Sequence, residues 1–388
     1  MPEGRQGAAV TRLILTDFRS YTGLRLTVEP RSVVLTGPNG AGKTNLLEAL
    51  SFLAPGKGLR RAAIADVVRR GSGLSDAAGD GGWAVAARVL PVSGASLDLG
   101  TGREPGPLER PGSDRRLVRV DGEAASGQSA LGERLSVLWL TPDMDGLFRG
   151  SAGDRRRFLD RLVTALDADH AGRANAYAHA QRERGRLLRE GRGTDAWLSG
   201  LEDAMARHGV ALVAARRDLV ARLSAAVGRA VGPFPRADLA LESEVGQWLL
   251  EGPALAAEDR LRDALSASRR RDAKAGGAAH GPHRDDLLVR HGPKDLPAAQ
   301  ASTGEQKAVL IALMLAQARV QAGTRTGAPL LLLDEVAAHL DQGRRAALFE
   351  ALDGLGVQAW VTGTDAQSFE SWEKTAQFLR IDEASVVQ

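Results

Sequence analysis

The chain has 388 residues, enough for two or three packed units with a sizeable hydrophobic core. Hydrophobic residues make up 43% and charged residues 26%, which is ordinary for a soluble globular protein. No apolar run approaches the roughly 18 residues of a membrane span, and the first residues lack the layout of a signal peptide, so we expect a cytoplasmic protein without a membrane partner. Cysteine is absent, which excludes disulfides, thiolate zinc sites and cysteine nucleophiles. The formal net charge of +3 does not by itself indicate nucleic-acid binding.

The first third of the chain has the pattern of short strands around one helix. Leu24, Leu26 and Val28 alternate with polar neighbours, as a half-buried strand requires. An apolar strand is followed by a Gly-rich turn and a helix-like stretch, and segments rich in Gly, Asp or Pro favour loops between further strands. The predicted elements are strands at 10–18, 24–29, 31–36, 83–90, 96–99 and 116–120, a helix at 44–53, and loops at 71–82 and 100–114.

The pattern becomes helical from Arg155 to about Val231. Seven residues in this stretch follow 3-4 spacing and share one stripe of a helix: Leu198, Leu201, Met205, His208, Leu212, Ala215 and Leu219. Such a stripe is usually helix packing, so we expect His208 to be a core or boundary histidine and not a ligand. The stripe lasts about three heptads, which predicts a short helical arm and not a long coiled coil.

Strands and helices alternate again beyond residue 280. We expect a strand at 287–290, a helix from near Thr303, a strand at 330–333, a helix after Gln342 and a last strand near 358–362. His280 and His283 have a spacing that could suit a metal ion. No third ligand of suitable spacing accompanies them, so a metal site is not expected there.

The strongest functional signal is a phosphate-binding loop with the pattern G-x-x-x-x-G-K-[ST] between an apolar strand and a helix. Its glycines let successive backbone N–H groups point at a phosphate beside the positive end of the following helix. Lys43 is placed to reach the β- and γ-phosphates of ATP, and Thr44 to bind Mg²⁺. The ATP-binding residues of the loop are Gly37, Pro38, Asn39, Gly40, Ala41, Gly42, Lys43 and Thr44.

A second signal is an acidic pair that follows four leucines. Leu330–Leu333 has the composition of a buried parallel strand, and Asp334 and Glu335 follow at its carboxyl end, where α/β sheets gather their ligands. We expect Asp334 to hold Mg²⁺, mostly through water, and Glu335 to orient or deprotonate the attacking water. Alone, such a strand could simply end in a turn, but its pairing with the loop favours an ATPase whose catalytic residues are Lys43 and Glu335.

A third segment allows two interpretations. Ser302 and Glu305 have the S-x-x-E spacing of a capping box, so this could be an ordinary capped helix. The segment also resembles the S-G-G-Q signature of ABC ATPases, in which the serine and the helix N-terminus hold the γ-phosphate of ATP bound to a second subunit. The order of loop, signature and acidic strand favours the ABC interpretation. The signature residues are Ser302, Gly304, Glu305 and Gln306, and the segment departs from S-G-G-Q at Thr303 and Glu305. After the acidic strand, Asp341 lies in a segment that resembles the D-loop, which would place it at the dimer interface.

Further motifs resemble the RecF family over nearly the whole chain, least between about 170 and 275. The segment L-T-D-F-R-S-Y at 15–21 is similar to the family's D-F-R-x-Y, and G-K-T-N-L-L-E-A at 42–49 to the loop shared with SMC and Rad50 proteins. The segment T-P-D at 141–143 is similar to S-P-E-D. More discriminating are R-R-F-L-D at 156–160, which resembles R-R-x-F-L-D, and G-P-H-R-D-D at 281–286, which matches the family's own motif.

The resemblance implies an α/β fold: an ABC-type P-loop ATPase head of two lobes with a short helical arm inserted. Residues 1–150 would form the N-terminal part of the head, 151–279 the arm, and 280–388 the C-terminal part with signature, acidic strand and D-loop. It also implies ATP and Mg²⁺ as cofactors, weak ATPase activity, an ATP-dependent homodimer, and binding of double-stranded DNA near gap junctions. With RecR, and indirectly RecO and RecA, such a protein directs RecA loading in recombinational repair.

Some positions depart from these patterns, and alternatives stay open. The switch histidine of ABC transporters is missing where Thr362-Gly363-Thr364-Asp365 resembles the family's T-x-T-D, which bears on hydrolysis speed more than on ATP binding. The main alternative is the nucleotide-binding subunit of an ABC transporter. The separation of about 260 residues between loop and signature argues against it. A Rad50-like head would need long coiled coils and a cysteine hook. A nucleotide switch that scarcely turns over is also possible.

DNA would be held by arginine contacts to phosphates, which are independent of base sequence. Each arginine cluster alone is more often a solvated face or an ion-pair partner. The candidate clusters are Arg60-Arg61, Arg69-Arg70, Arg115-Arg116, Arg155–Arg157 and Arg269–Arg271.

Overall fold

The computed structural model describes residues 6–69, 82–104, 116–228, 232–324, 326–338 and 340–387. The chain divides into two compact units. The first unit comprises Met1–Asp145, Ala230–Phe234 and Leu310–Gln388, and the second comprises Gly146–Arg229 and Pro235–Val309. Residues 280–309, which we grouped with the C-terminal part of the head, therefore belong to the same unit as the expected arm.

The first unit contains a mainly parallel sheet of six strands in the order β15-β14-β3-β13-β12-β8. Its strands are β3 Val33–Thr36, β8 Val137–Leu140, β12 Leu330–Leu333, β13 Ala359–Gly363, β14 Gln377–Asp382 and β15 Ser385–Val387. All of them are parallel except β15, which adds an antiparallel edge. Every residue of β3, β8 and β12 is buried, as expected for apolar strands covered on both faces. Because the strands are parallel, the carboxyl ends of β3, β12 and β13 lie along one edge of the sheet.

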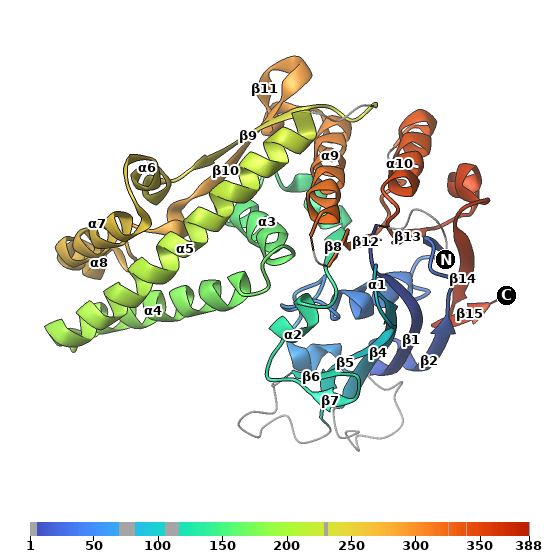
Figure 1. Cartoon of the computed structure of the whole chain (residues 1–388), viewed down its shortest axis with the longest axis horizontal. Coiled ribbons are helices and arrows are strands. Elements are labelled where there is room, and N and C mark those ends of the chain that lie inside the picture. Colours follow the sequence, from blue (N-terminus) through green and yellow to red (C-terminus); the bar gives the residue numbers. More distant parts are fainter. Residues whose placement is uncertain are drawn as a thin grey trace. The chain divides into compact units, whose positions relative to one another are not determined.

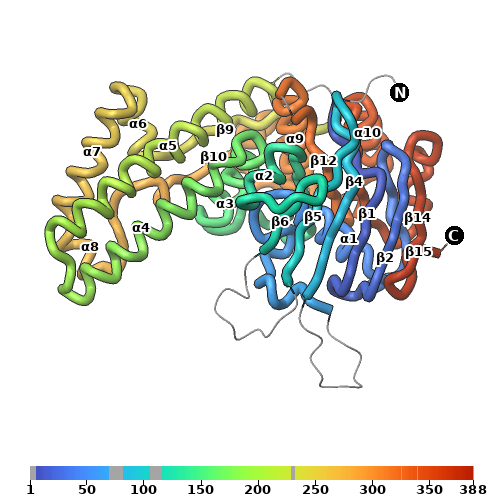
Figure 2. The backbone as a smooth tube through the Cα atoms, turned by 60° about the horizontal axis from the view of Figure 1, so that its bottom comes forward, coloured from blue at the N-terminus to red at the C-terminus, as the bar shows by residue number. Residues whose placement is uncertain are grey.

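The second sheet of this unit is antiparallel, with the order β2-β1-β4-β5-β6-β7 (Figure 2). Its strands are β1 Ala9–Phe18, β2 Tyr21–Thr27, β4 Trp83–Leu90, β5 Leu97–Arg103, β6 Leu117–Val120 and β7 Glu123–Ala124. Along β4 every second residue is buried, which is typical of a sheet with one packed face. Phe18 of β1 and Trp83 of β4 pack edge-to-face against Phe52, with ring centroids 5.1–5.9 Å apart. Phe52 directly follows α1 (Lys43–Ser51), so these rings anchor that helix to the antiparallel sheet.

Helix α1 lies in the core of the first unit, where Leu46, Leu47 and Leu50 pack with residues of both sheets. The remaining helices of the unit are α2 Ser129–Gly132 and α10 Gln342–Gly354, with 3₁₀ turns at Ile64–Val67 and Gln367–Trp372. Helix α9 (Thr303–Ala322) begins in the second unit and ends in the first, and a 3₁₀ turn at Pro142–Gly146 also spans the division.

The second unit combines helices with a small antiparallel sheet in the order β11-β10-β9. Its elements are α3 Ala152–Thr164, α4 His170–Glu190, α5 Asp195–Gly228, β9 Ala237–Glu242, α6 Glu244–Glu251, α7 Ala254–Ala267, α8 Arg269–Ala275, β10 Asp286–His291 and β11 Leu296–Pro297, with 3₁₀ turns at Pro282–Arg284, Gly292–Lys294 and Ala298–Gln300. Helices α4 and α5 lie side by side (Figure 1).

The stripe of α5 packs as the sequence predicts. Leu198, Met205, Leu212 and Leu219 are buried. His208 is partly buried on the same stripe, and burial lowers its pKa, so it is a boundary histidine as expected.

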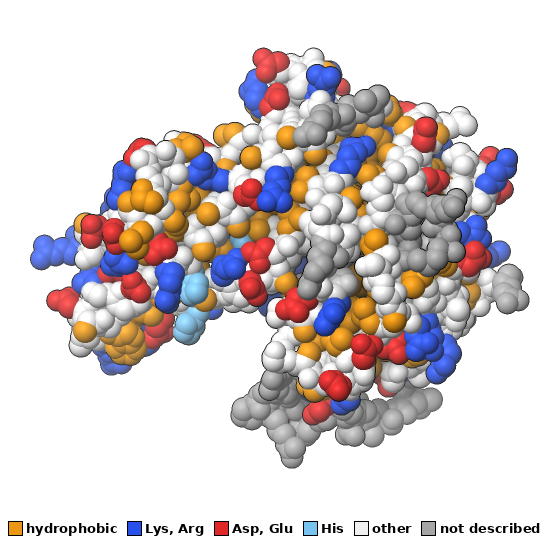
Figure 3. All heavy atoms as spheres, in the orientation of Figure 1, with side chains coloured by type: hydrophobic (Ala, Val, Ile, Leu, Met, Phe, Trp, Pro, Cys, Tyr) orange, Lys and Arg blue, Asp and Glu red, His pale blue; other side chains and the backbone are white. Residues whose placement is uncertain are grey.

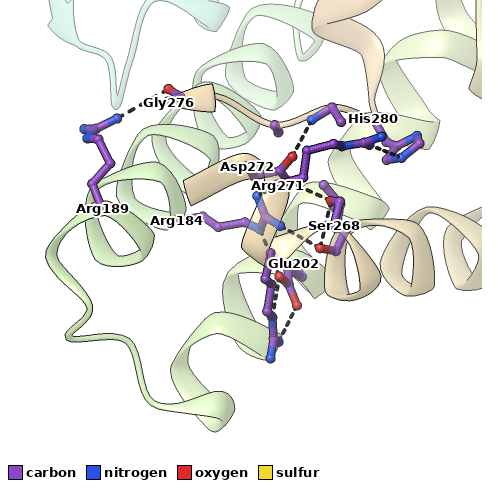
Figure 4. Close-up of polar contacts among 12 residues, drawn as sticks. Arg184, Arg189, Glu202, Ser268, Arg271, Asp272, Gly276 and His280 are labelled. Atoms are coloured by element: carbon purple, nitrogen blue, oxygen red, sulfur yellow. Dashed lines mark hydrogen bonds and ion pairs between the residues drawn. The ribbon is translucent and has the colours of Figure 1, made fainter. Parts of the chain in front are cut away.

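A buried ionic cluster joins the helices of the second unit (Figure 4). Arg184 of α4, which is 1% exposed, lies 2.9 Å from Glu202 of α5 and 2.9 Å from Asp272 of α8. The guanidinium also donates to the carbonyl oxygen of Leu265, and Ser268 donates to Asp272 at 2.7 Å. Removing one partner of such a cluster leaves a buried charge unpaired, which costs about 3–5 kcal/mol. The cluster therefore holds α4, α5, α7 and α8 in one arrangement.

Several elements differ from the sequence-based expectations. The strand expected to be the last is β13, and β14 and β15 follow it. The segment 151–279, expected to be a helical arm, includes β9, which pairs with β10. A loop was expected from residue 100, but β5 continues to Arg103 because Gly100–Gly102 pair with β4 and β6. Residues 70–81 and 105–115, which hold most of the two expected loops, lie outside the described residues.

Candidate ATP-binding site

The phosphate loop connects β3 to α1 at the carboxyl edge of the parallel sheet. Gly37 has a φ of 144°, and a Cβ there would collide with the carbonyl oxygen of Ile381. Gly42 has a φ of 108°, and a Cβ there would lie 2.8 Å from the hydroxyl of Tyr21. Both positions therefore require glycine. Tyr21, the tyrosine of the D-F-R-x-Y motif, donates to the carbonyl oxygen of Gly42 at 3.2 Å and so supports the loop from the antiparallel sheet.

The Lys43 side chain is buried and folds back over the loop. Its ammonium donates to the carbonyl oxygen of Gly37 at 2.7 Å and to that of Pro38 at 2.8 Å. Burial lowers the pKa of Lys43, while the carboxylates of Glu335 and Asp334 act in the opposite direction. The loop, the lysine and both acids thus meet at one place, as the sequence predicts.

The hydrogen bonds of Asp334 join three elements of the first unit. It directly follows β12, and its Oδ1 accepts a hydrogen bond from the Thr44 hydroxyl of α1 at 2.9 Å. The same oxygen accepts a hydrogen bond from the hydroxyl of Thr362 in β13 at 2.8 Å. Hydroxyl and carboxylate oxygens are the ligands that Mg²⁺ prefers, so Thr44 and Asp334 fit the metal expected from the sequence. The sequence shows Thr362 only as part of the T-x-T-D segment and does not indicate its contact with Asp334.

Glu335 has an unusual backbone next to this metal-binding pair. Its φ is 48°, in the left-handed region that residues with a Cβ rarely adopt. Its N–H donates to the Thr362 hydroxyl at 2.9 Å. Strained backbone of this kind is often found at functional sites.

Two further family motifs meet at α1. Glu48, which is fully buried, pairs with Arg19 at 2.7 Å and with Arg60 at 2.8 Å. Arg60 also donates to the side-chain oxygen of Asn45 at 2.7 Å. The arginine of D-F-R-x-Y, the glutamate of the loop motif and the arginine after α1 therefore form one ion-paired group. The sequence shows the motifs, but not that their charged residues pair with each other.

The signature segment begins α9 in the second unit. Ser302 and Glu305 form a capping box: the Ser302 N–H donates to Glu305 Oε2 at 3.0 Å, and the Glu305 N–H donates to Ser302 Oγ at 3.4 Å. Lys294 lies 2.6 Å from Glu305, and its hydrogen bond, with those from Ser302, lowers the pKa of Glu305 to about 2. Gln306 is buried and donates to the carbonyl oxygen of Ala301 at 2.7 Å. Ser302 itself is exposed, and a Cβ on Gly304 would meet no atom within 4 Å.

Both interpretations of this segment are compatible with that geometry. The capping box is present, as the simpler interpretation expects. An exposed serine at a helix N-terminus is also what the signature of an ABC ATPase requires.

Asp341, the expected D-loop residue, is the N-cap of α10. Its Oδ1 accepts a hydrogen bond from the N–H of Arg344 at 2.8 Å, and the side chain is exposed. His339 of the same segment lies outside the described residues.

The two most discriminating motifs are joined by a buried arginine that the sequence did not single out. Arg216 of α5 lies 2.8 Å from Asp160 of R-R-x-F-L-D and 2.8 Å from Asp285 of G-P-H-R-D-D. His170 also bonds Asp160 at 2.9 Å, and Arg155 pairs with Asp286 at 2.7 Å. These motifs therefore hold α3, α4, α5 and the start of β10 together.

His283, the histidine of G-P-H-R-D-D, is also held by hydrogen bonds within the second unit. Its two ring nitrogens bond the Tyr177 hydroxyl at 2.8 Å and the carbonyl oxygen of Ala278 at 2.9 Å. His280 instead bonds Glu244 at 2.8 Å. The two histidines thus have different partners.

Comparison with known proteins agrees with these motifs. Residues 9–86 match the family model described as the RecF/RecN/SMC N terminal domain. The DNA replication and repair protein RecF of Mesorhizobium japonicum is 49% identical to this chain, and the alignment covers 97% of each chain. The RecF of Rhizobium meliloti is 51% identical, with 96% of both chains covered. The chain belongs to the RecF family. The resemblance seen in the motifs is thereby confirmed, and the transporter alternative is not favoured.

Solved structures confirm the fold of this RecF family member. The structure of "the recombination mediator protein RecF-ATPrS in RecFOR pathway" aligns with a TM-score of 0.82 at 18% identity and covers 98% of both chains. An SMC head domain from Pyrococcus furiosus with an extended coiled coil aligns with a TM-score of 0.53 at 16% identity, covering 98% of this chain and 96% of that one. The fold is thus the α/β ATPase head of ABC type that RecF and SMC proteins share, as expected. In the part of the chain that the structure describes, no helix is long and apolar enough to cross a membrane.

Proposed function

We propose that this protein binds ATP with Mg²⁺ at the phosphate loop and uses slow hydrolysis to control its binding to DNA. The observation that carries the proposal is the hydrogen bond of 2.9 Å between the Thr44 hydroxyl and Asp334, because it joins the phosphate loop to the acidic strand. A hydroxyl and a carboxylate this close are the donors that Mg²⁺ takes beside a triphosphate. Membership of a family whose relatives are named DNA replication and repair protein RecF supports the role in repair.

Each residue of the site has its own part in the reaction. The backbone N–H groups of the loop would surround the β-phosphate, and Lys43 would donate to oxygens of the β- and γ-phosphates. Thr44 and Asp334 would hold Mg²⁺, which supplies charge neutralisation on the phosphates. Glu335 would orient the attacking water and accept its proton.

A second subunit would complete the site. The exposed Ser302 and the N-terminus of α9 at Gly304 would contact the γ-phosphate of ATP in the partner, with Asp341 at the interface. Glu305, which is paired with Lys294, and the buried Gln306 would support that turn. The exposed position of Ser302 at the N-terminus of α9 supports this, because the positive end of a helix suits an anion. ATP would then act as a clamp between two copies, and slow hydrolysis would release it. We place this activity in the cytoplasm.

DNA would be bound through phosphates, near gap boundaries in duplex DNA, where RecR and indirectly RecO would help to load RecA. Among the arginine candidates, Arg116 is buried and donates to the carbonyl oxygens of Ala54 and Gly56, so it is not available to DNA. Arg155 is paired with Asp286, as described above. Arg270 is exposed and Arg157 is about half exposed, and both remain candidates. On the face drawn in Figure 3, basic and acidic side chains are interspersed.

The proposal is tested by measuring DNA affinity and oligomeric state without nucleotide, with ADP and with ATP. The DNA probes are a labelled duplex and the same duplex with a single-stranded gap. We expect ATP to produce dimers and to tighten DNA binding. The affinity for DNA should fall steeply with salt: each phosphate contact should add about 0.9 to the slope of log binding constant against log salt concentration. The same DNA affinity in all three nucleotide states would contradict the switch. Absence of duplex binding in every nucleotide state would contradict the proposed role at DNA.

A further inference from the structure

Thr362 lies between the phosphate loop and the acidic strand. Its strand, β13, pairs with β3, which leads into the phosphate loop, and on its other side with β12, which leads into the acidic pair. Leu333 lies opposite Val361 in the register, so the residues that follow them, Asp334 and Thr362, are neighbours. The Thr362 side chain is fully buried. It has no place among the loop, acidic-pair and signature motifs.

The Thr362 hydroxyl makes two hydrogen bonds whose direction is fixed. The Glu335 backbone N–H can only donate, so the hydroxyl oxygen accepts that bond, at 2.9 Å. The single hydroxyl proton therefore goes to Asp334 Oδ1, at 2.8 Å. The same carboxylate oxygen also accepts the Thr44 hydroxyl at 2.9 Å. Two hydroxyls from different elements thus fix the orientation of the Asp334 carboxylate.

The second bond acts on the backbone of Glu335. This residue has a φ of 48°, which a residue with a Cβ adopts only when its surroundings hold it there. β12 ends at Leu333, and the bond that holds the Glu335 amide comes from the side chain of Thr362. The direction in which the Glu335 side chain leaves the backbone depends on this conformation. A single hydroxyl therefore constrains both acids.

We propose that Thr362 is a positioning residue, which sets Asp334 for the metal ion and Glu335 for the attacking water. The inference rests on the proposed ATPase function and deepens it. Thr362 acts through the two acids and needs no contact with the nucleotide. The reaction consequently requires the hydroxyl of residue 362, and not only a side chain of that size.

The variant Thr362→Val tests this directly, because valine keeps the shape of threonine and lacks the hydroxyl. Thr362→Ser restores the hydroxyl. The matched control is Ser32→Ala, since the Ser32 hydroxyl is also buried and accepts the N–H of Ala359 at 3.1 Å, at the start of the same strand. That control removes a comparable hydrogen bond from β13, one made to Ala359 and not to either acid.

Three quantities are measured: kcat for ATP, nucleotide affinity with Mg²⁺ and with EDTA, and the thermal unfolding temperature. Thr362→Val should bind ATP in EDTA within about threefold of the wild type, because the loop itself is unchanged. It should lose most of the gain in affinity that Mg²⁺ gives, and kcat should fall by about tenfold or more, since a hydrogen bond to a charged group is lost. Thr362→Ser should recover both quantities. Ser32→Ala should unfold at a lower temperature yet keep kcat and the Mg²⁺-dependent gain.

Two results would overturn the inference. One is a Thr362→Val variant with normal kcat and a normal Mg²⁺ response. The other is an equal loss of kcat in Ser32→Ala, which would mean that only the stability of β13 matters. A wild-type protein that binds no nucleotide would refute the proposed function instead. If the wild type binds ATP with Mg²⁺ but scarcely hydrolyses it, the Mg²⁺-dependent affinities of the variants decide the question.

Discussion

The Lys43 ammonium lies within 2.8 Å of two carbonyl oxygens of the loop, in a space that suits a compact charge. Arginine would keep the positive charge, but its planar fork is wider than an ammonium. We therefore predict that Lys43→Arg folds normally and that its ATP hydrolysis falls by about tenfold or more. Steady-state ATPase assays test this, with Lys57→Arg as the control because Lys57 is exposed. Turnover within about twofold of the wild type would argue against Lys43 as the phosphate lysine.

Glu335 is the second residue whose chemistry a single substitution can isolate. An amide cannot accept the proton of the attacking water, so Glu335→Gln should bind ATP normally and stall hydrolysis by about a hundredfold. A long-lived ATP-bound dimer is the expected product, visible by sedimentation after mixing with ATP. Glu373→Gln, which changes an exposed glutamate in the same way, should behave as the wild type. Normal hydrolysis by Glu335→Gln would show that another group takes the proton.

At the scale of elements, Asp160 gives the second unit a defined pH response. Burial acts to raise the pKa of Asp160, but the hydrogen bonds from His170 and Arg216 outweigh it and bring the pKa to about 2. Because the folded pKa lies below the ordinary value of 3.8, the carboxylate stabilises the folded state above that value. That stabilisation is lost as the pH falls from about 4 towards 2.

Asp160→Asn should therefore lower the free energy of unfolding by about 2–3 kcal/mol at pH 7, and by progressively less below pH 4. Urea unfolding of both proteins at several pH values measures this difference. The control is Asp218→Asn, which breaks an exposed pair with Arg222 and should change stability by less than about 1 kcal/mol at every pH. A difference for Asp160→Asn that does not change with pH would contradict the assignment.

The elements that the sequence predicted are those with a strong period or a motif. The four leucines of β12 and the alternating residues of β4 were located correctly. Strand β8 was missed because four apolar residues between loops have neither period nor motif, and its burial comes from pairing with β12, about 190 residues later in the chain. Strand β9 was missed because it lies between helices and pairs with β10, which only the folded chain brings close.

In the candidate site, too, the sequence predicted the residues that belong to motifs and missed those that arrive through tertiary structure. Lys43, Thr44, Asp334 and Glu335 belong to motifs with fixed spacing, and the structure brings them together. Thr362 reaches Asp334 only through the pairing of β12 with β13, which spacing along the chain does not indicate. The ion pair of Glu48 with Arg19 and Arg60 depends on tertiary structure in the same way.

At the scale of the whole molecule, the central expectation is an ATP site shared between two copies. Ser302→Arg should leave ATP binding by monomers unchanged, because the substitution lies in the second unit and the phosphate loop in the first. It should abolish ATP-driven dimers by placing a bulky side chain where the partner's nucleotide would bind. Sedimentation with a slowly hydrolysed ATP analogue measures this. Ser96→Arg, at another exposed serine, should dimerise normally.

Mixing experiments make the same test more specific. Ser302→Arg mixed with Lys43→Met should form one intact composite site of the two, and so dimerise partially. Normal dimers of Ser302→Arg alone would mean that the segment is only a capped helix, which is the simpler interpretation of its hydrogen bonds.

The strand order of the parallel sheet has a consequence for synthesis on the ribosome. Strand β3, which carries the phosphate loop, lies between β13 and β14, and both leave the ribosome long after it. At roughly 5–20 residues per second, the interval between Thr36 and Ala359 is on the order of tens of seconds. During that time β3 lacks both neighbouring strands, and its apolar residues need another partner or a chaperone. A nascent chain of this protein therefore acquires its nucleotide site only after β13 and β14 have been synthesised.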